Sequence, residues 1–146
     1  MSMEVSFASA EIEIVLHATE DRGKVLSVIE SVFAIKPEEF TASNVKGHFG
    51  NEIVFLKANL NSKQATGMAY KIAGTMSDAD RMHMHDNFEL YMNDKSSLHI
   101  RISKQKLFEQ KVMLSQSDSL KIKLKTVRRF QPKSEMENYR NFLAQR

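Results

Sequence analysis

The sequence predicts an α+β fold: a two-layer domain with a mostly antiparallel sheet and helices packed on one face of it. Two observations indicate this class. Several segments alternate apolar and polar residues with a period of two, as strands with one buried face do, and between them the apolar residues recur at helical spacing. Strands and helices do not alternate strictly along the chain, so hairpins are expected and the second sheet face can remain in water.

The first strand is expected at residues 11–16, where isoleucine and leucine alternate with glutamate and valine. Val5 and Phe7 alternate out of phase with it, which predicts a bulge or bend at residues 8–10. Thr19, followed by two acids, predicts a helix cap, because a hydroxyl accepts from a free amide and acids suit the positive helix end. An amphipathic helix should follow.

Residues 41–48 and 51–60 predict a hairpin, since the GHFGN string between them tolerates positive φ. Ser62 predicts the cap of a second helix. Ser77, with acids one and three residues later, predicts the cap of a third that runs to about Leu90.

Residues 98–102 and 120–124 again alternate and predict two more strands. Between them we expect a helical turn or loop at residues 104–109 and a short strand at residues 112–114. Residues 134–146 are mostly polar, with apolar residues at helical spacing, and predict a terminal helix that docks weakly.

The chain has 146 residues and an apolar fraction of 42%, enough for one domain with its own core. We place this domain at residues 1–130 and a basic tail with a short helix at residues 131–146. No run of 18 apolar residues and no signal-like start occurs, and cysteine is absent. We therefore expect no membrane association, no thiolate chemistry and a cytoplasmic location.

Charge is distributed unevenly along the chain. Residues 1–99 hold 9 Lys and Arg against 14 Asp and Glu, whereas residues 100–146 hold 12 against 4, so the net charges are −5 and +8. A basic surface of this kind suits a polyanion, and nucleic acid is the commonest one.

Lys121, Lys123 and Lys125 are the sharpest feature, because alternate residues of a strand point the same way, about 6.6–6.8 Å apart. Three ammonium groups in a row suit a phosphate backbone. The alternative interpretation is a solvated strand face, partly paired with Glu11 and Glu13 across the sheet. The same phosphate-binding surface is expected to include further cations: Arg101, Lys104, Arg128 and Arg129.

His48 and Phe49 lie between the glycines of the expected hairpin tip, where they could reach a base or sugar. The alternative is a plain hairpin turn. Phe108 and Phe130 are the other stacking candidates considered, and burial in the core is the competing interpretation for all three phenylalanines.

No catalytic or metal constellation stands out. His83, His85 and Asp86 form the densest cluster, but helical residues two apart do not share a face, so we predict no metal and no cofactor. A hydrolase using His17 or His48 as base is a weak alternative, since no nucleophile motif accompanies either histidine. We predict that the protein is not an enzyme.

Three strings in order carry a family resemblance: HATED at residues 17–21, GHFGN at residues 47–51 and SKQ at residues 103–105. The chain resembles, over about residues 10–127, the small archaeal RNA-binding proteins that have been described as predicted exosome-associated subunits. Two positions depart from the family pattern: Ser103 stands where an acid is usual, and Phe49 where a second histidine is usual.

The resemblance implies a two-layer α+β domain similar to the ribosomal large-subunit protein that binds the small ribosomal RNA. It implies RNA as a partner and brings no catalytic residue. By position, the family's strings fall on these residues: His17, Glu20, Asp21, Gly47, His48, Gly50, Asn51, Lys104 and Gln105.

We therefore expect a non-catalytic RNA-binding protein that contacts the phosphate backbone, in RNA processing or degradation with the exosome. The alternative is a protein-interaction subunit that docks an acidic partner through its basic face or its C-terminal helix. That helix could also form a homodimer contact.

Overall fold

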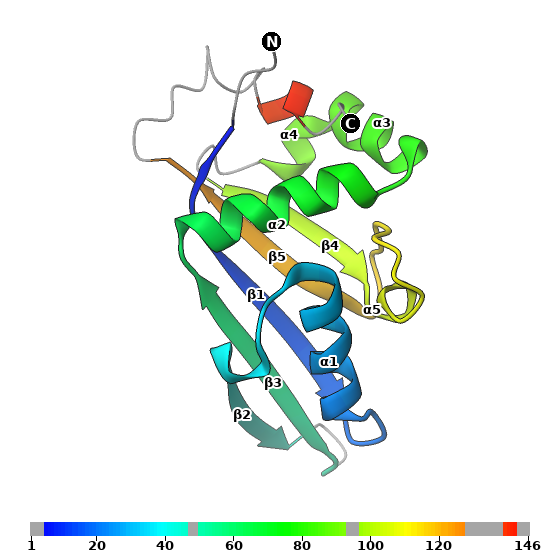
Figure 1. Ribbon diagram of the computed structural model, residues 1–146. Helices are drawn as coiled ribbons and strands as arrows, with labels where there is room; N and C mark the ends of the chain where they lie inside the picture. The colour runs from blue at the N-terminus through cyan, green and yellow to red at the C-terminus, as the bar shows by residue number, and fades with distance from the viewer. Residues whose placement is uncertain (1–4, 47–49, 93–96, 128–138, 143–146) are drawn as a thin grey trace.

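The computed structural model describes residues 5–46, 50–92, 97–127 and 139–142. A five-stranded antiparallel sheet in the order β2-β3-β1-β5-β4 forms one layer, and helices form the other (Figure 1). The α+β class expected from the sequence is confirmed.

The strands are β1 (Phe7–His17), β2 (Phe40–Lys46), β3 (Glu52–Leu60), β4 (Ser97–Ser103) and β5 (Ser119–Thr126). The helices are α1 (Arg22–Phe33), α2 (Ser62–Thr75), α3 (Asp78–Asp86), α4 (Phe88–Tyr91) and α5 (Lys104–Leu107), with a 3-10 turn, η1, at Pro37–Glu39. Residues 139–142 form a further helical turn.

The central strand, β1, pairs with β3 on one side and β5 on the other. Ile12, Ile14 and Leu16 are buried, as their alternation predicts. The register with β5 shifts between Phe7 and Ser9, so the expected bulge is present. The shift lets Phe7 enter the core although it is out of phase with Ile12.

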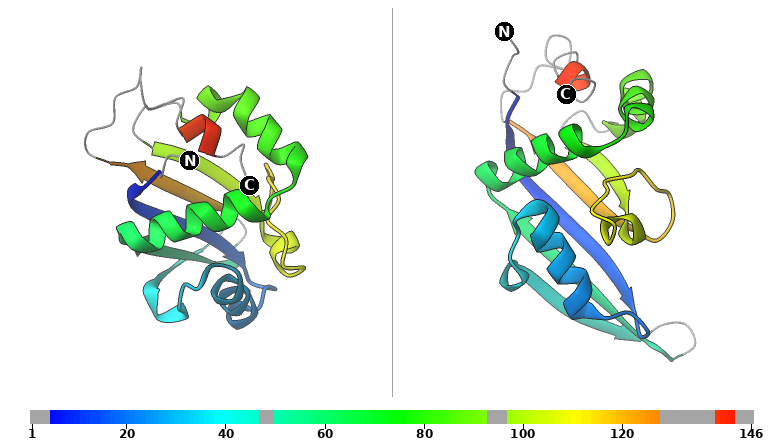
Figure 2. Two further views of the ribbon diagram at one scale, coloured as in Figure 1. Left: turned by 45° about the horizontal axis from the view of Figure 1, so that its top comes forward. Right: turned by 45° about the vertical axis from the view of Figure 1, so that its right-hand side comes forward.

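α1 and α2 cover the same face of the sheet (Figure 2). Their apolar residues, such as Ile29 and Ile72, are fully buried against the inward side chains of the strands. We call the other side of the sheet the open face. It carries the outward positions of the strands, including Glu11, Lys57 and Lys121, all at least partly exposed.

Two of the three helix caps differ from those expected. Asp21, not Thr19, caps α1 and accepts from the Lys24 amide at 3.1 Å, because residues 17–20 already form a turn closed by the Glu20 amide on the His17 carbonyl. The cap of α2 is Asn61 rather than Ser62, whose hydroxyl donates to the Phe7 carbonyl instead (2.7 Å).

Ser77 caps α3 as expected, but the helix does not run on to Leu90. Asn87 leaves the helical region (φ −121°, ψ 34°), and its side chain donates to the His83 carbonyl at 2.9 Å. The chain therefore breaks into α3 and the short α4.

The expected strand at residues 112–114 is reduced to a bridge between Ile102 and Leu114. The Leu114 amide donates to Asp80 Oδ2 (2.9 Å) rather than to a strand, so pairing does not extend. By contrast, the helical turn expected after residue 103 is present as α5, and the hairpin of β2 and β3 is confirmed on both sides of its tip.

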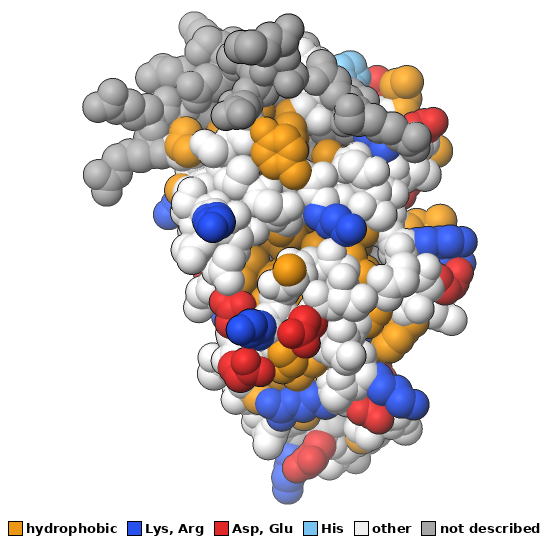
Figure 3. Space-filling model, viewed as in Figure 1, with side chains coloured by type: hydrophobic (Ala, Val, Ile, Leu, Met, Phe, Trp, Pro, Cys, Tyr) orange, Lys and Arg blue, Asp and Glu red, His pale blue; other side chains and the backbone are white. Residues whose placement is uncertain are grey.

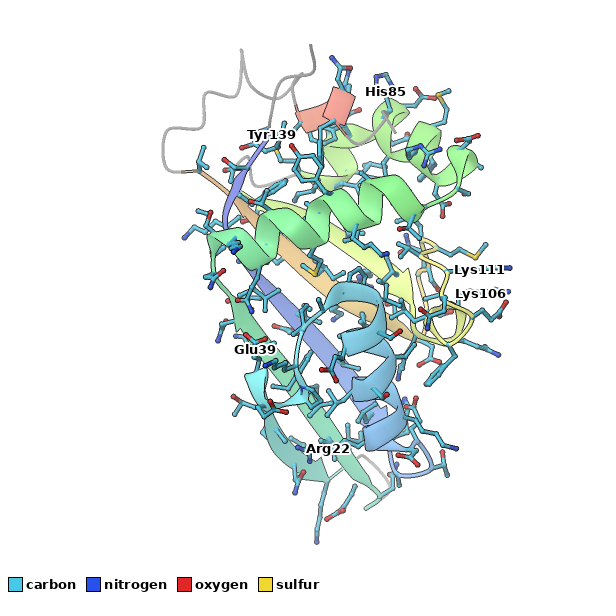
Figure 4. All side chains as sticks on the ribbon, viewed as in Figure 1. Arg22, Glu39, His85, Lys106, Lys111 and Tyr139 are labelled. Atoms are coloured by element: carbon cyan, nitrogen blue, oxygen red, sulfur yellow. The ribbon has the colours of Figure 1, made fainter. Side chains whose placement is uncertain are left out.

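The helical turn at residues 139–142 packs on the start of β1 (Figure 4). The Tyr139 ring lies 5.3 Å from that of Phe7, and its hydroxyl donates to the Ser6 carbonyl at 3.2 Å. Phe142 meets the ring of Tyr70 edge-on at 4.7 Å. The boundary predicted between domain and tail at residue 130 lies outside the described residues and stays a prediction.

Candidate nucleic-acid interface

The lysines of β5 lie on the open face. Leu120, Ile122 and Leu124 are at most 1% exposed in the core. Because side chains alternate along a strand, the three residues Lys121, Lys123 and Lys125 point the other way, and all three are exposed. We call these three residues the lysine row, and its predicted orientation is confirmed.

The edge strand β4 places two more nitrogen-bearing side chains beside the lysine row. Arg101 is the register partner of Lys121, and His99 is the register partner of Lys123. Both are exposed. Neighbouring strands lie about 4.8 Å apart, so the side chains of β4 and β5 can bind one extended anion together.

The glutamates of β1 border the lysine row on its other side. Glu13 is paired in register with Lys121 and Glu11 with Lys123. The ion pair that forms, however, joins Glu11 to Lys57 of β3, with 3.8 Å between Nζ and Oε1. No ammonium of the lysine row lies within 4.0 Å of a carboxylate in the part of the chain that the structure describes. β1 therefore lies beside the lysine row without forming an ion pair with it.

A hollow of ≈ 570 Å³ lies over this part of the open face. Its walls include Arg101, Lys121 and Lys123 together with Glu11 and Glu13, and Tyr91 of α4 also lines it. Burial raises the pKa of Tyr91 above the usual 10.0, and the Asp80 carboxylate raises it further. Its phenol therefore stays protonated and can donate a hydrogen bond to an anion in the hollow.

Lys104 does not belong to this surface. Its side chain is 3% exposed, and its Nζ lies 3.0 Å from Glu20 and 3.0 Å from Asp118 while donating to the Val15 carbonyl at 2.8 Å. An ammonium held by two carboxylates and a carbonyl is already satisfied. The prediction that Lys104 contacts RNA loses its basis.

This cluster joins two of the strings that carried the family resemblance. Glu20 comes from the HATED string, and Lys104 from the SKQ string. Glu20 Oε1 also accepts from the His17 amide at 3.0 Å. The pairing fixes the turn before α1 against α5, which is a structural role.

The remaining predicted contacts, His48, Phe49, Arg128 and Arg129, lie outside the described residues. So does Phe130. Phe108 is 48% exposed, but it lines a hollow with Lys24 and Ser27 of α1, which covers the opposite face of the sheet. It does not join the lysine row.

The sequence interpretation missed an exposed aromatic residue on the open face, Phe55 of β3, which is 42% exposed. Leu56, Ala58 and Leu60 face the core, so the odd positions of β3 face water. The alternation that located the strand therefore contained the signal.

Among the described residues, no group of three or more His, Asp or Glu side chains is placed to hold a metal. His83 meets the Tyr91 ring edge-on at 5.9 Å, whereas His85 Nδ1 lies 3.2 Å from Asp86. None of the described helices is both long and apolar enough to cross a membrane.

Comparison with known proteins gives two kinds of likeness. A family model described as RNA binding matches residues 9–126. A curated RNA-binding protein of Pyrococcus abyssi is 29% identical over 125 residues, which is 82% of this chain and 81% of the relative. The family model spans all five strands except the first two residues of β1, and it includes α1 and α2.

Solved archaeal structures share the fold. A protein of Archaeoglobus fulgidus assigned to the family DUF54 superposes with a TM-score of 0.76 at 26% identity, over 93% of this chain and 99% of that one. A DUF54 protein of Methanothermobacter thermautotrophicus gives 0.75 at 19% identity, over 94% and 98%.

Proposed function

The chain belongs to the RNA-binding family whose model covers residues 9–126, and we propose that it binds RNA through the open face of its sheet. The open face then acts as a basic surface for the phosphate backbone. The proposed contacts are Arg101, Lys121, Lys123 and Lys125. Arg128 and Arg129, which stand shortly after β5 in the sequence, are proposed contacts as well. Lys104 is left out, because its ammonium is buried.

The observation that carries the proposal is the exposure of the lysine row with Arg101 and His99 alongside. Each phosphate that such cations neutralise releases counterions, so binding gains affinity and becomes salt-dependent. Contacts to phosphate position an RNA without reading its sequence. On the helix-covered face, cations and acids are interspersed (Figure 3), whereas the acids of the open face, Glu11 and Glu13, lie together on β1.

Three finer points belong to the same proposal. The protein acts without catalysis, and its lysine row and Arg101 serve to bind phosphate. It works in the cytoplasm, in RNA processing or degradation. The resemblance to predicted exosome-associated subunits supports an RNA-processing complex as its setting.

The alternative, docking of a partner through the C-terminal helix, needs that helix to expose its apolar residues. Tyr139 is 5% exposed, and it packs with Phe142 on the chain's own Phe7 and Tyr70. Two of the apolar side chains at helical spacing in residues 134–146 are therefore already in contact with the domain. This disfavours docking through the C-terminal helix, and docking of an acidic partner through the basic face is the alternative that the RNA titration below tests.

The first experiment is fluorescence anisotropy of a labelled RNA single strand and a labelled RNA duplex, titrated with protein at several salt concentrations. It compares the wild type with Lys121→Glu/Lys123→Glu/Lys125→Glu. We expect wild-type binding that weakens with salt. In the variant we expect weaker binding and a slope of log K against log salt that is shallower by about two to three.

The matched control is Lys24→Glu/Lys63→Glu/Lys71→Glu, which changes net charge equally on exposed residues of α1 and α2. It should lose much less affinity. Equal losses in the two variants would reduce the effect to net charge and reject the open face as the site. A wild type that binds neither RNA would reject RNA binding itself.

A further inference from the structure

The open face has a second region, beside the lysine row, that is apolar. Val45 is 48% exposed and Phe55 42% exposed, and Ile53 is partly exposed between them in the β2–β3 ladder. Val15 of β1 pairs with Phe55 in register. We call Val15, Val45, Ile53 and Phe55 the apolar strip.

Phe55 is the aromatic member of this strip, and its surroundings leave room for a planar ligand. Its register neighbours are Ser43 on β2 and Val15 on β1, both smaller than the phenylalanine ring. A hollow of ≈ 470 Å³ adjoins it and is also lined by Thr41, Ser43 and Asn59. Polar groups thus stand around an exposed ring.

One cation, Lys57, lies next to the ring, and its Nζ is 3.8 Å from Glu11 Oε1. Lys57 is the next outward residue of β3, about 6.6–6.8 Å further along the strand. Lys57 pairs in register with Glu13, and Glu13 in turn with Lys121 of the lysine row. The path from the ring to the proposed phosphate contacts therefore runs from Phe55 to Lys57 along β3, and then across β1 to Lys121 on β5.

An aromatic ring beside a cationic track is the arrangement that proteins use for single-stranded nucleic acid. Unpaired bases can stack on the ring while their phosphates follow the cations. The bases of a duplex are already stacked and paired, so their faces are not available to a side chain. The arrangement therefore discriminates between the two forms of RNA.

We propose that the RNA bound by this protein is single-stranded and that one of its bases stacks on Phe55. This deepens the RNA-binding proposal above and rests on it. Charge complementarity favours RNA over an apolar protein surface as the occupant, because Lys57 adjoins the strip and Lys121 lies beyond Glu13, two strands away. A protein partner or a second copy on the strip is the competing outcome.

Trp fluorescence offers a direct test, because the chain contains no tryptophan. Phe55→Trp places a single indole at the site. A stacked base quenches indole emission, so we expect quenching that saturates with an unlabelled single strand and not with a duplex. Phe108→Trp is the matched control: its parent side chain is similarly exposed, at 48%, but lies beside α1, and its emission should not change.

Affinity gives an independent readout in the same anisotropy assay. We expect Phe55→Leu to weaken single-strand binding roughly tenfold, since a base–aromatic stack is lost. Phe55→Tyr should keep nearly wild-type affinity. Duplex affinity and the salt slope should change in neither variant, because no charge is removed. Circular dichroism melts establish that each variant is folded.

The possible results separate the two proposals. If single strands and duplexes bind equally and Phe55→Leu changes neither affinity, base stacking is rejected while RNA binding stands. If the wild type binds no RNA, both proposals fall. If sedimentation shows a dimer that Phe55→Leu dissociates, without any effect on RNA affinity, the strip is a contact between copies and the stacking proposal is overturned.

Discussion

At the scale of single residues, the Lys104 ammonium is one of two buried cations among the described residues, the other being Arg81. The Lys104 ammonium is satisfied by Glu20, Asp118 and the Val15 carbonyl, which come from three separate segments of the chain. A buried ion pair adds little net stability when intact, but breaking one leaves an uncompensated charge. Removing one partner of Lys104 should therefore cause a measurable loss of stability.

We expect Glu20→Gln to lower the free energy of unfolding by about 2 kcal/mol, less than the loss of a fully uncompensated buried charge, because Asp118 remains beside the ammonium. Urea denaturation followed by circular dichroism measures the change. RNA affinity of the folded variant should equal that of the wild type, since Lys104 does not reach the open face.

The control is Glu109→Gln in the loop after α5, which breaks exposed ion pairs to Lys106 of α5 and to Lys111, both labelled in Figure 4. Its effect should be less than about 1 kcal/mol. Unchanged stability in Glu20→Gln together with weaker RNA binding would return Lys104 to the list of RNA contacts.

At the scale of elements, strand positions could be predicted because alternation depends on the local sequence alone. Ile12 and Ile122 are buried as their patterns indicate, and Phe7 follows the predicted bulge. The helix caps shifted because neighbouring residues compete for the same amides: Asp21 displaced Thr19 when residues 17–20 formed a turn. Local sequence propensity is a poor guide to which of several neighbouring residues caps a helix.

The candidate site was predictable to a similar degree. The orientation of the lysine row follows from the alternation of inward and outward residues along β5. The same alternation along β3 would also have revealed that Phe55 faces outward. The burial of Lys104 could not be foreseen, since Glu20 and Asp118 stand 84 residues before it and 14 after it, and no charge pattern in the sequence links them. Tertiary contacts override charge composition at such a position.

The C-terminal helical turn is an element whose contribution to stability can be measured. Tyr139 is 5% exposed against Phe7, so we expect Tyr139→Ala to lower the free energy of unfolding by about 3 kcal/mol. Asn141→Ala, on the exposed side of the same turn, should change it by less than about 0.5 kcal/mol. Chemical denaturation of both variants tests this, and equal stabilities would mean that the turn does not hold the start of β1.

At the scale of the whole molecule, the fold brings the acidic and basic parts of the chain onto one surface. β1, from the acidic part, lies between β3 and β5, so Glu11 and Glu13 separate Lys57 from the lysine row. On the open face the charge alternates by strand: cations on β3, acids on β1 and cations on β5. A bound RNA that crosses from Phe55 to Lys121 passes over the acids.

If RNA crosses β1 in this way, removing an acidic charge from β1 should raise the affinity for RNA. Glu13 pairs in register with both Lys57 and Lys121, so Glu13→Gln removes the repulsion of phosphate between two proposed contacts. One unit charge about 5 Å from a phosphate in water corresponds to roughly a threefold change in affinity, so we expect Glu13→Gln to bind single-stranded RNA roughly threefold tighter at low salt. Glu30→Gln, on the exposed side of α1, is the control for net charge and should have a smaller effect. Anisotropy titrations of both variants decide the point: an unchanged affinity in Glu13→Gln would mean that RNA stays on β4 and β5 and does not cross β1 to reach Phe55.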